Sequence, residues 1–452
     1  MSAPKLATLV AASVLALGLG MNASAMTFAE AFDAAQRNDA QYRAAGHELD
    51  SARLAVPMAR AALLPVVGFN AATAEVNGSR QFPNSLNQDT RVRVEYSSPQ
   101  ASLSLRVPIY NQEARSRWQY TQAQSDAAES VYRSRGTELI DRLAAAYLQV
   151  LLAEEVQRLA DAQVEALTVQ TRQADQRFKR GEGTRVDVAQ TQAALDLARV
   201  RSLEATDALD LARRQMRRIT GLPSEALKRA PTDLVPDGKP LESLVDWLQI
   251  ALRQSPSLQA REQALVAARM NVSRNFAGHL PRVDLVASVS RSQNESLNTL
   301  NQTSTLKSLG LQLSVPIYNG GGVDASVKQA MADQSRVEEE IRSERENIEV
   351  EVQRHYMAVT NGSAKIGAYH RAVESSELAL LGTRRVLEQG LGTNNDVADA
   401  QARLYGAQRD LAQARIEYLQ SRLRLMLHAG LPMIEVVTEL DRSLTGAPSA
   451  QR

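Results

Sequence analysis

The residues of this sequence that could do chemistry are acids, glycines and a few histidines, because the chain contains no cysteine. Without cysteine there is no disulfide framework, zinc–thiolate site or cysteine nucleophile. The five histidines are scattered along the chain and lack the His-Glu-x-x-His spacing of zinc hydrolases. No Gly-x-Ser-x-Gly motif is present, and no set of catalytic residues can be assembled. We therefore expect no enzyme, no cofactor and no metal site.

The acids of interest follow a motif that occurs twice. Gly-x-Gly-Thr stands at Gly181, Gly183 and Thr184 and again at Gly390, Gly392 and Thr393. Asp187 follows the first copy, and Asp396 and Asp399 follow the second. Each motif lacks the third glycine of a phosphate-binding loop and follows a helix rather than a strand, which predicts a hairpin turn. Asp396 and Asp399 lie on one face of a helix, where first-turn acids complement the helix dipole.

Long helices must carry these motifs. No proline occurs from Ile109 to Leu222 or from Ile317 to Leu431, and proline breaks helix interiors. Large apolar residues recur every seven positions after the second motif, at Val397, Leu404, Leu411, Tyr418 and Leu425. The first four are each followed three positions later by alanine or serine, and the last by His428. Strict sevens predict coiled-coil packing. We expect long helices over about 113–180 and 323–389, returning over 184–220 and 394–429.

The chain is internally duplicated. Its halves align at an offset of about 209 residues, and Val107-Pro108-Ile109-Tyr110-Asn111 recurs as Val315-Pro316-Ile317-Tyr318-Asn319. We assign residues 1–25 to a signal peptide, 26–230 to the first repeat and 231–452 to the second, which ends in a C-terminal tail. The 52 basic and 51 acidic residues balance, which excludes a strongly basic nucleic-acid binder.

Each repeat also contains a strand pair, at about 64–108 and 281–316. Apolar residues alternate with polar ones, as in Leu309, Leu311 and Leu313, and the polar segments 77–90 and 292–303 are predicted as loops. Strands of about ten residues with one apolar face fit a bilayer-spanning barrel, but four strands cannot close one, so two or three copies would have to pool them. A soluble β-sandwich hairpin and a soluble coiled-coil rod are the alternatives.

Order, duplication and spacing of these motifs together resemble the TolC family of outer-membrane channels, over essentially all of the mature chain. The closest likeness is in Val315-Pro316-Ile317-Tyr318-Asn319-Gly320-Gly321 and in Gly-x5-Asp-Val at Gly181 and Gly390. The resemblance implies an α+β membrane protein that forms a homotrimer. Its four β-strands per chain would contribute to a 12-stranded β-barrel in the outer-membrane lipid, and its long coiled-coil helices would form a periplasmic α-barrel.

The resemblance also implies partners and sites. The tips at Gly181–Thr184 and Gly390–Thr393 would dock a periplasmic adaptor (membrane fusion) protein, itself joined to an inner-membrane ABC transporter or proton-driven pump. Asp396 and Asp399, with Asp187, would line the periplasmic entrance. Leu387 and Gly392 depart from the family pattern, which has a tyrosine and an arginine there. The implied function is a passive conduit for type I secreted protein or for small-molecule efflux. The alternative is an exported coiled-coil structural or adhesive protein without a pore.

Overall fold

The computed structural model describes residues 26–83, 85, 88–223, 227, 243–296 and 299–445. The predicted signal peptide, residues 1–25, lies outside this part. The chain divides into two compact units, and the long helices α3 (Gln112–Lys179) and α7 (Gly322–Glu388) each contribute to both. The first unit contains residues 1–44, 135–255 and 347–452, and the second contains residues 45–134 and 256–346. No helix within the described ranges is both long and apolar enough to cross a membrane.

The second unit is built around one antiparallel sheet in the order β1-β2-β3-β4. Its strands are β1 (Val66–Pro83), β2 (Asp89–Asn111), β3 (Arg282–Ser296) and β4 (Thr299–Ser314). The prediction of strands about ten residues long, with polar loops at 77–90 and 292–303, was wrong. Those segments are largely paired strand, because their hydroxyl and amide side chains bond across the ladder: the Ser292 and Ser304 hydroxyls are 3.2 Å apart, and Gln81 Nε2 donates to Asp89 Oδ2 at 3.0 Å.

The two faces of the sheet differ in chemistry, as the alternation predicts. Val67, Leu105, Ala287 and Leu309 lie directly opposite one another across the four strands. The next row consists of Gly68, Ser104, Ser288 and Ser308, and successive side chains point to opposite faces. The Ser288 and Ser308 hydroxyls are 2.8 Å apart on this polar face. One face is therefore apolar and the other hydroxyl-rich.

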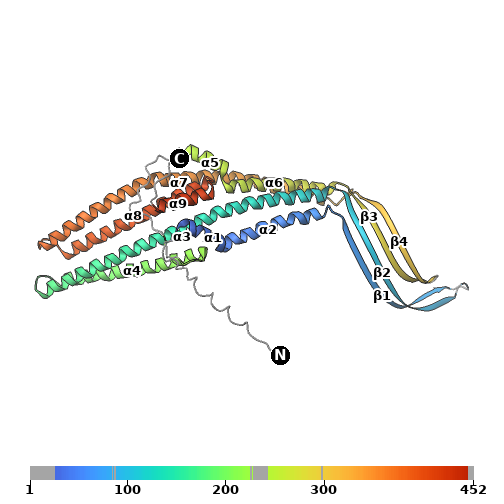
Figure 1. The fold of residues 1–452 in the computed structure, drawn as a ribbon, viewed down its shortest axis with the longest axis horizontal. Helices are drawn as coiled ribbons and strands as arrows, with labels where there is room; N and C mark the ends of the chain where they lie inside the picture. Colours follow the sequence, from blue (N-terminus) through green and yellow to red (C-terminus); the bar gives the residue numbers. More distant parts are fainter. Residues whose placement is uncertain are drawn as a thin grey trace, which may run out of the picture. The chain divides into compact units, whose positions relative to one another are not determined.

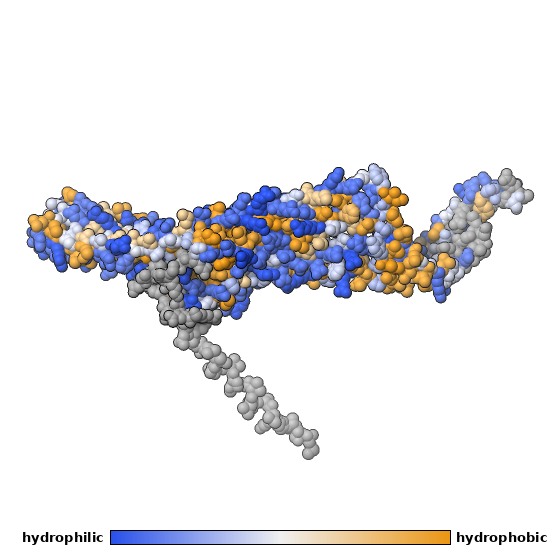
Figure 2. All heavy atoms as spheres, turned by 90° about the horizontal axis from the view of Figure 1, so that it is seen from above, coloured by the Kyte–Doolittle hydropathy of each residue, from blue (hydrophilic) through white to orange (hydrophobic). Residues whose placement is uncertain are grey.

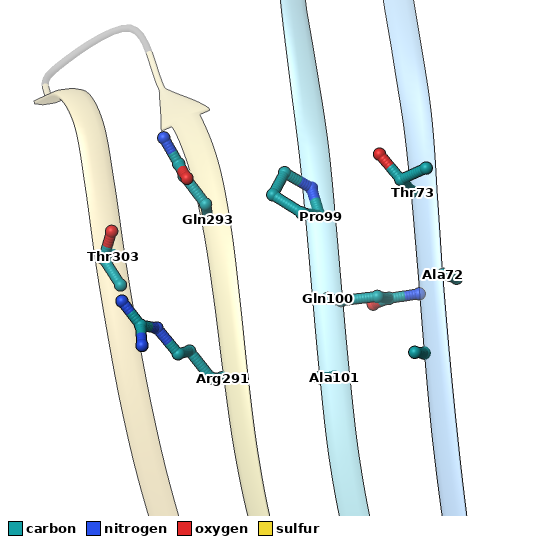
Figure 3. Close-up of a pocket in the computed structure, with 9 residues that line it drawn as sticks. Ala72, Thr73, Pro99, Gln100, Ala101, Arg291, Gln293 and Thr303 are labelled. Carbon is teal, nitrogen blue, oxygen red and sulfur yellow. The ribbon is translucent and has the colours of Figure 1, made fainter.

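The apolar face is exposed in the chain. Leu309 is 76 % exposed, Leu311 69 % and Leu313 65 %. Hydrophobic surface gathers at the end of the sheet that adjoins the helices, and the far end of the sheet is more hydrophilic (Figure 2). Farther along, small residues and Arg291 line a shallow groove of about 390 Å³ to which all four strands contribute (Figure 3). The apolar surface is thus a band of limited height.

Helices complete the second unit. The second unit contains α3 up to residue 134 and α7 up to residue 346. It also contains most of α2 (Ala40–Ala61), α6 (Pro256–Phe276) and the short 3₁₀ helix η1 (Ala277–His279). Ion pairs connect neighbouring helices, with Arg261 2.8 Å from Glu340 and Arg53 3.5 Å from Glu129. These pairs are largely exposed and contribute little stability each.

The first unit consists of two helical hairpins and three short helices (Figure 1). α4 (Arg185–Thr220) returns beside α3, and α8 (Asn394–His428) returns beside α7; α1 (Phe28–Asn38), α5 (Leu244–Gln254) and α9 (Met433–Thr445) pack at their base. Of the large residues predicted for the seam of α8, Val397, Leu411, Tyr418 and Leu425 are buried and Leu404 is half-buried, and Ala400 and Ala414 are buried beside them. The corresponding buried residues of α4 are Leu195, Ala198, Ala205, Leu209, Ala212 and Met216. Alanines at alternate seam positions let the backbones approach closely.

A small core around α1 packs this helix against α3 within the first unit. The Phe28 ring meets Tyr147 edge-on at 5.6 Å between centroids, and the Tyr147 hydroxyl donates to the Met26 carbonyl at 3.0 Å. Asp39 is buried and accepts two hydrogen bonds from the Arg142 guanidinium, at 3.0 and 3.1 Å. Burial alone would raise the pKa of Asp39, but the bonds from Arg142 and from the backbone N–H of Tyr42 outweigh it and lower the pKa.

Candidate functional site

The two hairpin tips share one backbone design. Gly181 has φ +77° and Gly390 has φ +78°, the left-handed conformation in which glycine is strongly favoured. After each glycine the next backbone N–H closes a six-residue ring: Glu182 N donates to Arg177 O at 2.9 Å, and Leu391 N to Val386 O at 3.0 Å. These bonds define a Schellman motif, which satisfies the last carbonyls of α3 and α7.

The second glycine of each tip is required for close approach. A Cβ on Gly392 would lie 3.1 Å from the Val386 side chain and 3.3 Å from Leu387 N. A Cβ on Gly183 would lie 3.4 Å from Phe178 N. The turn folds back tightly onto the preceding helix in both repeats. An arginine at position 392 would therefore require its neighbours to shift.

Threonine and aspartate then start the returning helices. Thr184 and Thr393 are N-caps of α4 and α8, and Asp187 and Asp396 complete reciprocal capping boxes. Asp396 Oδ2 accepts from Thr393 N at 2.9 Å and from its hydroxyl at 2.7 Å, while Asp396 N donates back to Thr393 Oγ1 at 3.2 Å. Both acids therefore hold a helix terminus together, which is the structural role that first-turn acids commonly have.

These contacts set the charge of the tips. The side-chain and backbone hydrogen bonds from Thr393 lower the pKa of Asp396, which is fully exposed. Those from Thr184 lower the pKa of Asp187, with smaller contributions from Asn394 and from the positive charge of Arg177. Asp399 is exposed, one turn after Asp396, and its Oδ2 is 3.4 Å from Asn395 Nδ2. The N-terminus of α8 thus presents two carboxylates, of which Asp396 is ionised at neutral pH.

The structure brings the two tips of one chain together through Asn394, a contact that the sequence analysis missed. Asn394 is the first residue of α8, and its side chain contributes to the lowered pKa of Asp187 in α4. Its backbone carbonyl accepts from the buried side-chain amide of Gln170 in α3 at 2.8 Å. The first repeat has Arg185 at the corresponding position. That difference between the repeats is a signal in the sequence, but only the fold shows what Asn394 contacts.

The remaining tip residues differ in exposure. Leu387 packs against the cluster formed by Leu380, Val397 and Ala400, so the residue that departs from the family pattern belongs to the hairpin core. Val186 and Leu391 are 63 % and 80 % exposed at the very tips. Each hairpin end therefore carries an exposed apolar side chain beside a rigid turn.

The helical unit also gathers histidines that the sequence analysis described as scattered. His355 in α7 and His428 at the end of α8 stack with their ring centroids 5.5 Å apart, and Glu351 Oε2 lies 3.5 Å from His355 Nε2. Burial, with the neighbouring charge of His428, lowers the pKa of His355 to about 4. Helices far apart in sequence supply these side chains, so spacing along the chain could not reveal the cluster.

Long hairpins with capped tips, joined to strands that form a sheet with one exposed apolar face, define the class of outer-membrane export channels. The family model described as outer membrane efflux protein matches twice, over residues 31–222 and 247–431, and the chain belongs to this family. The double match also bears out the duplication. The protein is thus an outer-membrane channel component, as the sequence resemblance implied.

Individual relatives agree with this assignment. The chain is 33 % identical over 436 residues to the proteases secretion protein PrtF of Dickeya chrysanthemi, covering 95 % of this chain and 93 % of that protein. It is 32 % identical over 432 residues to the alkaline protease secretion protein AprF of Pseudomonas aeruginosa, covering 94 % and 88 %. The Campylobacter jejuni CmeC outer membrane channel has a similar fold, with a TM-score of 0.77 at 14 % identity over 98 % of both chains.

Proposed function

We propose that three copies of this chain form a passive conduit from the periplasm to the exterior, which itself catalyses no reaction. The sheet carries this proposal. β1 and β4 are its end strands, and its apolar face is exposed. In lipid an open strand edge leaves unpaired N–H and C=O groups that cost several kcal/mol each. Three copies would pool 3 × 4 strands into one closed twelve-stranded barrel, wide enough to leave a channel, with its apolar face toward lipid.

The hairpin tips would form the periplasmic entrance. Three copies of Asp396 and Asp399 would place six carboxylates around one axis, where like charges attract cations. Asp396 can serve both as helix cap and as part of this ring, because its cap bonds favour the ionised form. The hydrogen bond from Gln170 to the Asn394 carbonyl would hold the two tips of one chain together in the closed state.

The same tips would dock the periplasmic adaptor. Gly181, Gly183 and Thr184 in one turn, and Gly390, Gly392 and Thr393 in the other, fix the backbone so that Val186 and Leu391 project into solvent. Exposed apolar side chains on rigid turns are suited to binding a partner helix. The adaptor would connect the conduit to an inner-membrane ABC transporter or proton-driven pump, which supplies the energy.

We propose secreted protein as the cargo. Two relatives above 30 % identity are named for protease secretion, and they match along nearly the whole chain. Small-molecule efflux is the second candidate, and a more distant relative, at 23 % identity over 87 % of this chain, is the solvent efflux pump outer membrane protein SrpC of Pseudomonas putida. The structural alternative, an exported coiled-coil protein without a pore, would leave the apolar face of the sheet unexplained.

Single-channel recording in planar bilayers tests the conduit. We expect purified protein to give discrete conductance steps with cation preference, and Asp396→Asn together with Asp399→Asn should reduce that preference. Asparagine keeps an acceptor for the Thr393 cap, so the change removes charge rather than the helix start. Asp410→Asn, an exposed acid elsewhere in α8, is the control. A complete lack of conductance would overturn the channel, and unchanged selectivity would remove the acid ring.

Secretion by cells tests the cargo. A strain that lacks its own outer-membrane component would receive this chain together with the ABC transporter and adaptor of a protease secretion system. Active protease in the medium supports protein cargo. Protease retained in the cell, with restored resistance to toxic small molecules, would instead establish efflux.

A further inference from the structure

Glu351, His355 and His428 form a three-residue cluster of metal-ligand chemistry, well away in sequence from the tips. One ligand atom from each lies within 4.8 Å of the other two. Tetrahedral zinc with ligand distances of about 2.0–2.2 Å separates its ligand atoms by roughly 3.3 Å. Each pair therefore has to close by about 1.5 Å at most, which side-chain rotation can supply.

The helices fix the backbone positions from which these side chains approach one another. Glu351 and His355 are four residues apart on α7 and so share one face. His428 is the last residue of α8 and stacks on His355 with the ring planes 15° apart. His355 is only 8 % exposed, while Glu351 and His428 are half-buried. The site has a closed inner side and an open outer side, so an ion can enter from solvent.

The duplication shows that packing alone does not require these residues. At the offset of 209 the first repeat has Arg142, Ala146 and Ile219 in place of Glu351, His355 and His428. Ala146 and Ile219 are buried at 8 % and 5 % exposure. An apolar pair therefore fills the equivalent helix contact in the other hairpin. The second hairpin has instead two imidazoles, which are poorer core residues unless their nitrogens have partners.

The surrounding charges are compatible with a cation. Arg354, whose side chain is exposed, pairs with the half-buried Glu351 at 3.0 Å, and this pair would be exchanged for the metal. Arg424 is engaged by Asp141 at 2.8 Å, so its charge is partly neutralised. Two imidazoles with one carboxylate favour zinc-like divalent transition ions over calcium or magnesium, which prefer oxygen ligands.

We propose that Glu351, His355 and His428 bind a divalent transition ion of the zinc type, which ties α7 to the C-terminal end of α8. Three protein ligands leave one tetrahedral position for water. Because the ligands converge only in the folded hairpin, the ion stabilises the folded state by mass action. The ion would act where the second hairpin is joined to its base, and its role is independent of cargo.

Zinc titration of the whole mature protein tests this inference. The protein is prepared in detergent without a histidine tag and stripped with a chelator, and Zn²⁺ is added in a calorimeter. We expect one ion per chain and a higher thermal midpoint with zinc. His428→Ile, which copies the first repeat, should weaken binding at least about tenfold, since even residues behind a ligand contribute 10–100-fold. Co²⁺ should give the intense visible absorption of a tetrahedral site.

Two further variants keep the test decisive. Glu351→Gln removes a half-buried ligand with little change in volume, so it serves if a histidine change impairs folding. His370→Ala is the matched control, because His370 lies on the same helix 3.5 Å from Glu374 but is exposed and has only that one candidate co-ligand. No saturable binding by the unaltered protein, or equal loss in the His370→Ala and His428→Ile variants, would overturn the proposal.

Discussion

A methyl group added at Gly430 should destabilise the helical unit more than the same change at other left-handed glycines. Gly430 has φ +74°, and a Cβ there would lie 2.3 Å from Gln254 O and 2.9 Å from Ser255 N. These are backbone atoms at the end of α5, and Ser255 N donates to Ala251 O at 2.9 Å. The chain cannot relieve the clash by rotating a side chain, so α5 or the turn before α9 must move.

Two matched glycines separate the contributions. Gly390 has φ +78° with nothing within 4 Å of the added carbon, so Gly390→Ala should cost only the left-handed strain of about 1–2 kcal/mol. At Gly221 the carbon would lie 2.7 Å from Asn38 Oδ1. Asn38 can turn away but gives up its bond to Ile219 O, for about 1 kcal/mol more. Gly430→Ala adds a backbone shift of about 1–3 kcal/mol or more to the strain.

Thermal melting of the full chain in detergent, followed by helical circular dichroism at one scan rate, measures this order. A fixed scan rate is needed because unfolding of such proteins is commonly irreversible. We expect the midpoint to fall least for Gly390→Ala, more for Gly221→Ala and most for Gly430→Ala. Equal midpoints for the Gly430→Ala and Gly390→Ala variants would show that the contact with α5 does not constrain the fold, and would refute the reasoning.

Three further outcomes are expected. Arg142→Met should lower the free energy of unfolding by about 2 kcal/mol, because Asp39 stays buried without its charged partner. Since the folded state lowers the pKa of Asp39, the stability that this pair contributes is present at neutral pH and is lost as the pH falls below about 4. Melting curves of the variant should lack this acid dependence. Leu311→Asp should abolish the outer-membrane oligomer in membrane fractions, while Ser308→Asp on the opposite face, across from Ser288, leaves it; equal effects would contradict the assignment of the faces. Gln170→Leu should raise conductance in bilayers by removing the donor to the Asn394 carbonyl and so loosening the tips, and an unchanged conductance would remove this contact from the closed state.

Features set by local periodicity could be predicted from the sequence. The seven-residue repeat in α8 placed Val397, Leu411 and Leu425 in the buried seam, and all three are buried. Alternation in β4 placed Leu309 and Leu311 on one face, as the register has them. Helical and strand periods follow from the geometry of the backbone itself, so a single sequence carries them. The same holds for the glycine turns, where φ > 0 strongly restricts the residue type.

Features set by contacts between distant segments could not be predicted. Gln170 and Asn394 are 224 positions apart, and neither the type nor the spacing of these residues indicates their hydrogen bond. His355 and His428 are on different helices, so their stacking depends on the relative rotation of α7 and α8. Strand length was also missed at 77–90, because polar side chains such as Gln81 satisfy one another across the ladder where a loop would satisfy them with water.

Comparison of the two repeats distinguishes residue types that are the same in both, because the backbone conformation restricts them, from residue types that differ between them. Gly181 and Gly390 have the same φ to within a degree, and Thr184 and Thr393 form the same capping box. Both features are kept because a helical hairpin cannot turn and restart without them. Where one repeat packs Ala146 against the apolar seam, the other has a buried imidazole at His355. Ala146 and His355 are equally buried, so burial alone does not dictate the residue type there, and a function specific to the second hairpin should be sought at such positions.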